Sequence, residues 1–204
     1  MEEHLAAFTR VARDSREYQG HGWGCAWLDG GRWRLYHNIA PIWEDGWRPP
    51  GRTTLLLAHA RSAFRDEGIR VENNMPFQDG ERVFVFNGEL HGVRIRERGR
   101  IGAEKVFNFV RRFDRGDFRL ALERGLAAIE RRTRRLRAVN LIVADTSRRV
   151  HLATTFREDP DYFQMHSAER YGTRVICSDP YPDSLHPRPG WTPIANGTVA
   201  AWEP

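Results

Sequence analysis

The stretch Leu55–Leu90 reads LLLAHARSAFRDEGIRVENNMPFQDGERVFVFNGEL and contains two apolar segments that each end at polar residues. An apolar strand ends at His59-Ala60-Arg61, and a polar loop then passes through Asn73-Asn74-Met75-Pro76. A second apolar strand, Val83 to Phe86, leads directly into Asn87-Gly88. The pattern predicts two buried strands that end at polar residues on a shared edge.

These polar residues suit the recognition of an amide that carries a carboxylate. Arg61 offers a planar fork of donors that matches a carboxylate. Asn87 offers an amide donor, and Gly88 permits a left-handed turn that exposes a backbone N–H, so the pair would form an oxyanion hole. Two structural alternatives stay open, namely an Arg61 paired with Glu72 or Asp66, and an ordinary hairpin turn at Asn87-Gly88.

Five sequence blocks, taken in order, resemble those of class II glutamine amidotransferases, whose glutaminase domain is an N-terminal-nucleophile hydrolase. The blocks are GHGWGCAW (20–27), HAR (59–61), NNMPF (73–77), FNGEL (86–90) and GAEKVFNF (102–109). Each block alone is weak, but their order and spacing together are moderately specific, and they cover nearly the whole chain.

The resemblance implies an α+β fold, a four-layer αββα sandwich in which the first strand is missing, formed by a single domain over residues 1–204. It implies glutamine or a related amide as the substrate, with no cofactor and no metal. Because no synthase domain is attached, transfer of the ammonia would need a separate synthase subunit or would not occur.

The resemblance also assigns roles to individual residues. Asn87 and Gly88 would be catalytic, as the oxyanion hole. Gly102 stands where the family commonly has an Asp that holds the α-ammonium group, so Glu104 or another acid would take that role. His59 is expected to be a buried scaffold residue, and Trp23 a core residue first and a pocket wall second. The predicted substrate-binding residues are therefore Arg61, Glu104, His59 and Trp23.

The family's nucleophile does not occur in this sequence. It is an N-terminal Cys whose thiolate attacks the amide, after which ammonia leaves and water hydrolyses the thioester. This chain begins Met1-Glu2. We expect a sequence truncated at its 5′ end, or else a protein that has dispensed with the first strand, and in either case inactivity as written. Cys25 and Cys177 lie in apolar strands and are interpreted as structural thiols.

Length and composition favour one globular domain of 204 residues with 40% hydrophobic content. No apolar run approaches 18 residues and the N-terminus is charged, so we expect no membrane span and no signal peptide. Two cysteines form no disulfide framework, which favours a reducing, cytoplasmic location.

The basic residues are almost all arginine. The net charge is +5, and Lys105 is the one lysine among 32 basic residues. A cluster, Arg131 to Arg137, is interpreted as a solvated helix face, so no nucleic-acid partner is expected. An RNA-associated protein that uses this cluster is the alternative ranked last.

Periodicity predicts strands, then two helices, then strands. The expected helices span residues 3–17, 102–113 and 117–137, the last capped by Asp117. GHGWGCAWLD (20–29) is expected to be a Gly-punctuated entry to a strand, followed by a hairpin turn at Asp29-Gly30-Gly31. The other expected strands are 32–38, 92–95, 139–145, 150–156, 162–166, 173–178 and 197–202.

The function predicted from these observations is a glutaminase domain. It would hydrolyse a glutamine-type side-chain amide and release ammonia. The alternative is a catalytically silent homologue that binds a small amide or scaffolds a synthase.

Overall fold

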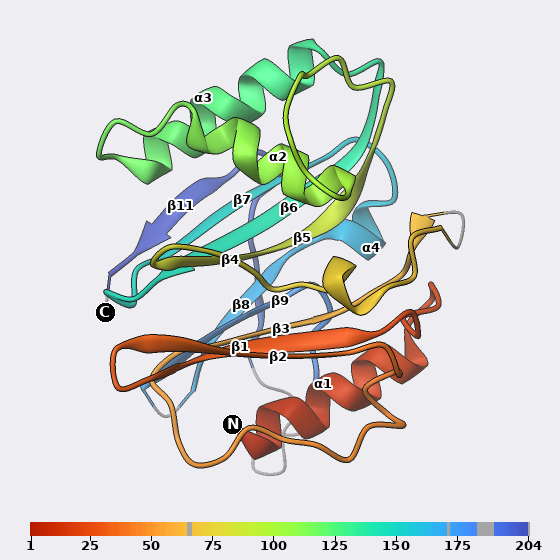
Figure 1. The fold of residues 1–204 in the computed structure, drawn as a ribbon, viewed down its shortest axis with the longest axis vertical. Coiled ribbons are helices and arrows are strands. Elements are labelled where there is room, and N and C mark those ends of the chain that lie inside the picture. The colour runs from red at the N-terminus through yellow and green to blue at the C-terminus, as the bar shows by residue number, and fades with distance from the viewer. Residues whose placement is uncertain (65–66, 171, 183–189, 204) are drawn as a thin grey trace. The chain divides into compact units, whose positions relative to one another are not determined.

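The computed structural model describes residues 1–64, 67–170, 172–182 and 190–203, and it shows a mixed α/β fold with several sheets (Figure 1). The chain divides into two compact units. Unit 1 comprises Met1–Val85 and Val143–Arg149, and unit 2 comprises Phe86–Ile142 and Val150–Glu203.

Unit 1 is built on a three-stranded antiparallel sheet in the order β2-β1-β3. Its strands are β1 (Trp23–Asp29), β2 (Arg32–Asn38) and β3 (Leu56–Ala60). Gly30 and Gly31 both have positive φ, as a two-residue hairpin turn requires. A short 3-10 helix, η2 (Val71–Asn73), and a short strand, β4 (Phe77–Asp79), follow.

Helix α1 (Glu2–Asp14) packs on one face of this sheet. Alternate residues of a strand point to the same face, so Trp23, Cys25 and Trp27 of β1 form one row. Leu5 and Ala12 of α1 join that row in a single buried cluster. The alternation of side chains along β1 therefore explains why the helix covers this face.

Unit 2 contains most of a five-stranded sheet in the order β11-β7-β6-β5-β4, and a small sheet in the order β10-β8-β9. Its helices are α2 (Gly102–Arg111), α3 (Phe118–Arg131) and the short α4 (Pro160–Phe163). The strands are β5 (Arg82–His91), β6 (Arg135–Asp145), β7 (Val150–Phe156), β8 (His166–Arg170), β9 (Thr173–Cys177), β10 (Thr192–Pro193) and β11 (Val199–Trp202).

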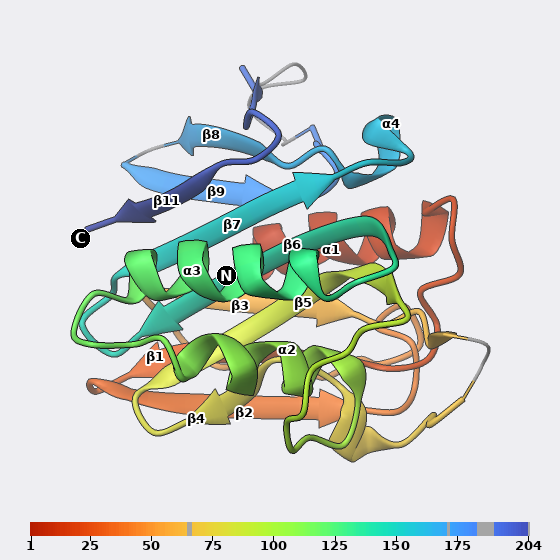
Figure 2. The ribbon, with the colours of Figure 1, turned by 90° about the horizontal axis from the view of Figure 1, so that it is seen from above.

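Helices α2 and α3 lie side by side over one face of the larger sheet (Figures 1 and 2). Gly125 permits their close approach, because a Cβ at this position would lie 2.9 Å from Cα of Val110. Asp117 caps α3 as predicted, with its carboxylate accepting a hydrogen bond from Leu120 N at 3.0 Å.

Several predicted boundaries are wrong. The strand expected at Val83 to Phe86 continues to His91, and residues 92–95 form no strand. The helix expected over 117–137 ends at Arg131, where β6 soon begins. The strand expected at 162–166 instead contains the end of α4 and the first residue of β8.

Candidate functional site

Arg61 is a buried cation that no acidic side chain accompanies within the described part of the chain. Arg61 is the residue directly after β3, and it is only 6% exposed. Nη1 donates to the Gly68 carbonyl at 2.9 Å and Nη2 to the Glu67 carbonyl at 3.5 Å. Burial lowers the pKa of the Arg61 guanidinium. The expected structural alternative, a pair with Glu72, is not formed, and Asp66 lies outside the described residues.

The backbone around Arg61 is held by the segment that precedes β1, which forms an isolated β-bridge between Gly20 and Arg61. Arg61 N donates to the Gly22 carbonyl at 2.9 Å, and His21 N donates to the Arg61 carbonyl at 3.0 Å. Gly22 has φ +100°, and a Cβ there would lie 2.1 Å from Nδ2 of Asn74. Gly22, the middle glycine of the GHGWG block, is therefore required both by its backbone conformation and by the close approach of Asn74.

The two asparagines of the NNMPF block support the loop that receives Arg61. Asn73 Nδ2 donates to the Gly68 carbonyl at 2.9 Å, the same oxygen that Arg61 contacts. Asn74 Nδ2 donates to the Asn38 carbonyl at 2.8 Å, while its buried Oδ1 has no hydrogen-bond partner within the described residues. Asn73 thus positions the carbonyl that Arg61 contacts, whereas Asn74 connects the block to the end of β2.

His59 and Trp23 lie in the sheet of unit 1, one on each of two paired strands. His59 is opposite Gly24 and Ala60 is opposite Trp23. Trp23 is completely buried, and its Nε1 donates to Asp45 Oδ2 at 2.9 Å. This packing favours the core role of Trp23 over the role of a pocket wall. Asp45 stands in a Trp- and Pro-rich loop without a recognisable motif, so no local signal predicts the contact.

Asn87 and Gly88 lie inside β5, which corrects the predicted turn. Gly88 does not have positive φ, so it provides neither a left-handed turn nor a hairpin. A Cβ at Gly88 would lie 2.3 Å from the carbonyl oxygen of Ala138 on β6, so the glycine is needed for close approach of the neighbouring strand. The half-buried amide side chain of Asn87 makes no hydrogen bond within the described residues.

Glu104 already has a partner. Its Oε2 accepts a hydrogen bond from Arg100 N at 2.6 Å, and its Oε1 forms an ion pair with Nη2 of Arg100 at 2.9 Å. The hydrogen bond from the Arg100 side chain lowers the pKa of the Glu104 carboxyl. The carboxylate stabilises the N-terminus of α2, so a substrate ammonium would have to displace Arg100.

Cys25 has the properties of a structural thiol. It is completely buried in the cluster between α1 and β1, and burial raises its pKa to about 12. A thiol with such a pKa is protonated at neutral pH and therefore is a poor nucleophile. Cys177 is half-buried on β9.

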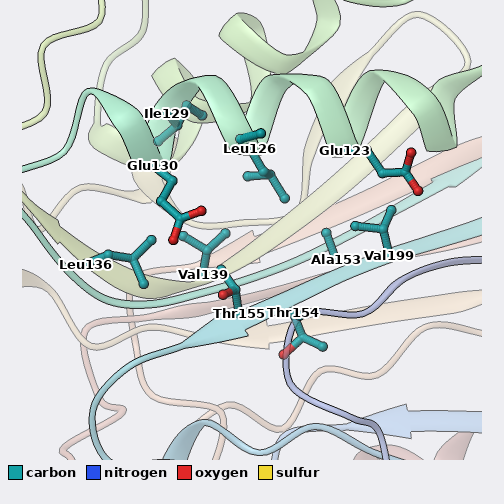
Figure 3. A pocket seen from close by; sticks show the side chains of 12 residues that line it. Glu123, Leu126, Ile129, Glu130, Leu136, Val139, Ala153, Thr154, Thr155 and Val199 are labelled. Atoms are coloured by element: carbon teal, nitrogen blue, oxygen red, sulfur yellow. The ribbon is translucent and has the colours of Figure 1, made fainter.

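Two concave regions within the units do not contain the predicted site residues. In unit 2, a half-open cleft of about 260 Å³ lies between α3 and strands β6, β7 and β11 (Figure 3). Its apolar lining includes Leu126, Val139 and Val199, and the two acids at it, Glu123 and Glu130, pair with Arg119 and Arg157. In unit 1, a cavity of about 350 Å³ is lined by Trp27, Asp29, Arg34, Pro50, Gly51 and Arg52.

The described residues support neither a metal site nor a membrane-spanning helix. No group of three or more His, Cys, Asp or Glu side chains is arranged to hold a metal ion there. Within the same residues, every helix is too short or too polar to span a bilayer.

Comparisons with known proteins give a match in structure but not in sequence. No protein-family model and no curated protein matches the chain. Among solved structures, the fold is similar to that of a glutamine phosphoribosylpyrophosphate amidotransferase from B. subtilis, complexed with ADP and GMP, with a TM-score of 0.59. The similarity is one of fold.

This amidotransferase shares 13% of aligned residues with the chain, and the match covers 85% of this chain and 38% of the other. The chain thus spans well under half of the length of its structural neighbour. The fold expectation is confirmed at a coarse level, as a mixed α/β fold similar to that of this amidotransferase.

Proposed function

We propose that this chain is a glutaminase-type domain that binds a glutamine-like amide through its free carboxylate. The observation that carries the proposal is Arg61, a buried guanidinium whose hydrogen bonds go to backbone carbonyls of Glu67 and Gly68. A buried charge without a counter-ion costs several kcal/mol, so such a group is expected where a ligand provides the missing charge. A carboxylate is the anion that fits the guanidinium fork.

The test of this step is binding, measured by isothermal titration calorimetry with L-glutamine. We expect Arg61→Lys to weaken binding at least tenfold, since an ammonium cannot form the two parallel hydrogen bonds of the fork. Arg70→Lys is the matched control, because Arg70 is exposed on the same loop. Equal affinities of the Arg61→Lys variant and the wild type would exclude Arg61 as the carboxylate ligand.

The second step of the proposal is hydrolysis of the side-chain amide, with release of ammonia. We assign the stabilisation of the oxyanion to the side-chain amide of Asn87, whose N–H groups donate no hydrogen bond within the described residues. The corrected conformation of Gly88 removes the argument for its backbone N–H, so Gly88 is retained as a packing residue. Removal of one oxyanion donor typically reduces kcat by about 10²–10³-fold, and we expect this loss for Asn87→Ala with little change in glutamine affinity.

The nucleophile of this hydrolysis would be an N-terminal Cys thiolate, which the 204-residue sequence does not contain. Activity is therefore tested in a protein that carries such a residue, made by extending the chain with the coding sequence upstream of Met1. Ammonia release that requires both the added Cys and Arg61 supports the glutaminase.

A catalytically silent homologue is the second candidate, because Cys25 cannot take the place of the N-terminal nucleophile. That thiol is completely buried, with its pKa raised to about 12. If the extended chain binds glutamine with wild-type dependence on Arg61 but releases no ammonia, the protein is a sensor or a scaffolding subunit. A stop codon directly upstream of Met1 would support the same candidate.

A further inference from the structure

A row of exposed arginines follows β5 in unit 2. Between residues 93 and 100 the side chains alternate, with Val93, Ile95 and Glu97 half-buried. The residues between and after them are exposed arginines, namely Arg94, Arg96, Arg98 and Arg100. The alternation orients this segment so that one side contacts the protein and the other presents guanidinium groups to solvent.

A second group of arginines lies beside the start of this row. Arg94 N donates to the Arg132 carbonyl at 2.9 Å, and Arg134 N donates to the His91 carbonyl at 3.2 Å. Gly92, with φ +65°, permits the contact, since a Cβ there would lie 3.0 Å from Cβ of Arg134. The fold therefore joins two basic segments that are about forty residues apart in the sequence.

Six arginines of these segments are exposed and make no ion pair within the described residues. We call them the basic patch: Arg94, Arg96, Arg98, Arg131, Arg132 and Arg134. The two acidic residues next to these arginines in the sequence form ion pairs with other arginines. Glu97 pairs with Arg112, and Glu130 pairs with Arg157. The patch therefore carries positive charge that the described protein residues do not neutralise.

The structure divides the arginine cluster that the sequence presents as one helix face. Arg131 is the last residue of α3, whereas Arg135 and Arg137 lie on β6. Arg135 pairs with Glu158, and Arg137 pairs with Glu89 and Asp159. These two arginines are neutralised within the fold, and we exclude them from the basic patch.

We propose that the basic patch binds the phosphate backbone of a double-stranded nucleic acid without sequence preference. Guanidinium groups match phosphate oxygens geometrically, and several of them in one region form the electrostatic footprint of such a partner. Proteins that bind single strands add exposed aromatic platforms for base stacking. Phe109, the ring beneath Arg132, is 4% exposed and therefore is not such a platform.

An anionic membrane surface is a less suitable partner for the same charges. Membrane-surface proteins combine basic residues with apolar side chains that insert into the bilayer. Among the described residues, the exposed large hydrophobic side chains all belong to unit 1: Tyr18, Ile39, Phe64, Ile69 and Val71. The basic patch in unit 2 has no such side chain.

The test is the salt dependence of binding to labelled duplexes of about 20 base pairs, as DNA and as RNA, measured by fluorescence anisotropy. Six phosphate contacts predict a slope of log K against log salt of about −5 for duplex DNA, because each contact contributes about −0.9. The variant R94Q/R96Q/R98Q should reduce the steepness of this slope by about 3. The control variant R10Q/R32Q/R124Q changes the net charge equally at exposed arginines outside the patch and should keep the wild-type slope.

Each other outcome overturns the proposal. Equal losses in the two triple variants would mean that net charge, and not the patch, attracts the duplex. Tighter binding to a single strand than to the duplex would contradict the assignment of the ligand. Binding to vesicles of anionic lipid with none to either duplex would assign the patch to a membrane. Circular dichroism melting curves must show that both variants are folded before the slopes are compared.

Discussion

The guanidinium of Arg61 donates to the carbonyl oxygen of Gly68 at 2.9 Å, and the side-chain amide of Asn73 donates to the same oxygen at 2.9 Å. One backbone carbonyl thus fixes a buried cation and the loop that covers it. A carbonyl oxygen carries only partial negative charge, so the arrangement orients Arg61 without neutralising it. Among the described residues no acidic side chain compensates this charge, and we regard the charge as a feature kept for ligand binding at the expense of stability.

Replacement of Arg61 by a neutral side chain of similar length should therefore not destabilise the fold. For Arg61→Met we expect a free energy of unfolding that is unchanged or higher by up to about 2 kcal/mol, because the cost of burying the charge disappears. Urea denaturation measures this difference, with Arg70→Met as the exposed control. A loss of more than about 1 kcal/mol at Arg61 would show that the guanidinium has a mainly structural role.

Gly88 should not accept a side chain. In Gly88→Ala the new methyl group would lie 2.3 Å from the carbonyl oxygen of Ala138, so β5 and β6 would have to separate. Overpacking of this kind costs about 1–3 kcal/mol, which a thermal or urea denaturation curve detects. Gly102→Ala serves as the control, since nothing lies within 4 Å of a Cβ there. Equal stability of Gly88→Ala and wild type would contradict the close approach of β5 and β6 at this residue.

The Asp45 carboxylate should contribute to stability in a manner that depends on pH. It accepts hydrogen bonds from Trp23 Nε1, Tyr36 OH, Asn38 Nδ2 and Trp47 N, at 2.7–2.9 Å. Burial alone would raise the pKa of Asp45, but the hydrogen bonds, led by that from Trp47 N, outweigh burial and lower the pKa.

Because the folded pKa of Asp45 is below its ordinary value of 3.8, the contribution is complete above that value and is lost as the pH falls through the folded pKa. At pH 7, Asp45→Asn should reduce the free energy of unfolding by about 2 kcal/mol, the typical value of a hydrogen bond to a charged group. The difference from wild type, measured by urea denaturation from pH 7 to pH 3, should shrink below pH 4. A difference that stays constant over this range would contradict the assignment.

Cys25 should react with thiol reagents only after unfolding. Its complete burial denies access to the reagent, and its pKa of about 12 keeps it protonated. Alkylation with iodoacetamide at pH 8, followed by mass spectrometry of peptides, should label the half-buried Cys177 faster than Cys25 in the folded chain. In urea the two should react at similar rates. Rapid labelling of Cys25 in the folded protein would contradict its role as a buried structural thiol and would make it a candidate nucleophile.

Local patterns predict the elements whose structure is decided locally. The strands at 32–38 and 150–156 have the predicted bounds, because alternating apolar residues define them and turn residues precede them. Asp117 is likewise predicted correctly, since a cap depends on residues three positions away. The early part of the chain, a helix followed by a Gly-Gly hairpin, follows the same logic.

Positions decided by distant partners are not predicted. Asn87-Gly88 is the strongest local signal for a turn, yet contact with Ala138, fifty residues on, requires a glycine within a strand. The partners of Arg61 are backbone carbonyls of its own loop, whose conformation depends on Asn73 and Gly22. The pairing of Arg94 with Arg132 has no local signal at all, because it joins a loop to the end of a helix.

The central claim is that Arg61 recognises the carboxylate of an amino-acid amide, and the ligand itself offers the most direct test. Calorimetric titration of the wild-type chain should compare L-glutamine with L-glutaminamide, in which a neutral amide replaces the α-carboxylate. We predict that L-glutamine binds and that the loss of its carboxylate weakens binding by at least tenfold, a difference that should vanish in Arg61→Met. Equal affinity of the wild-type chain for the two ligands, or no binding of L-glutamine, would contradict the claim.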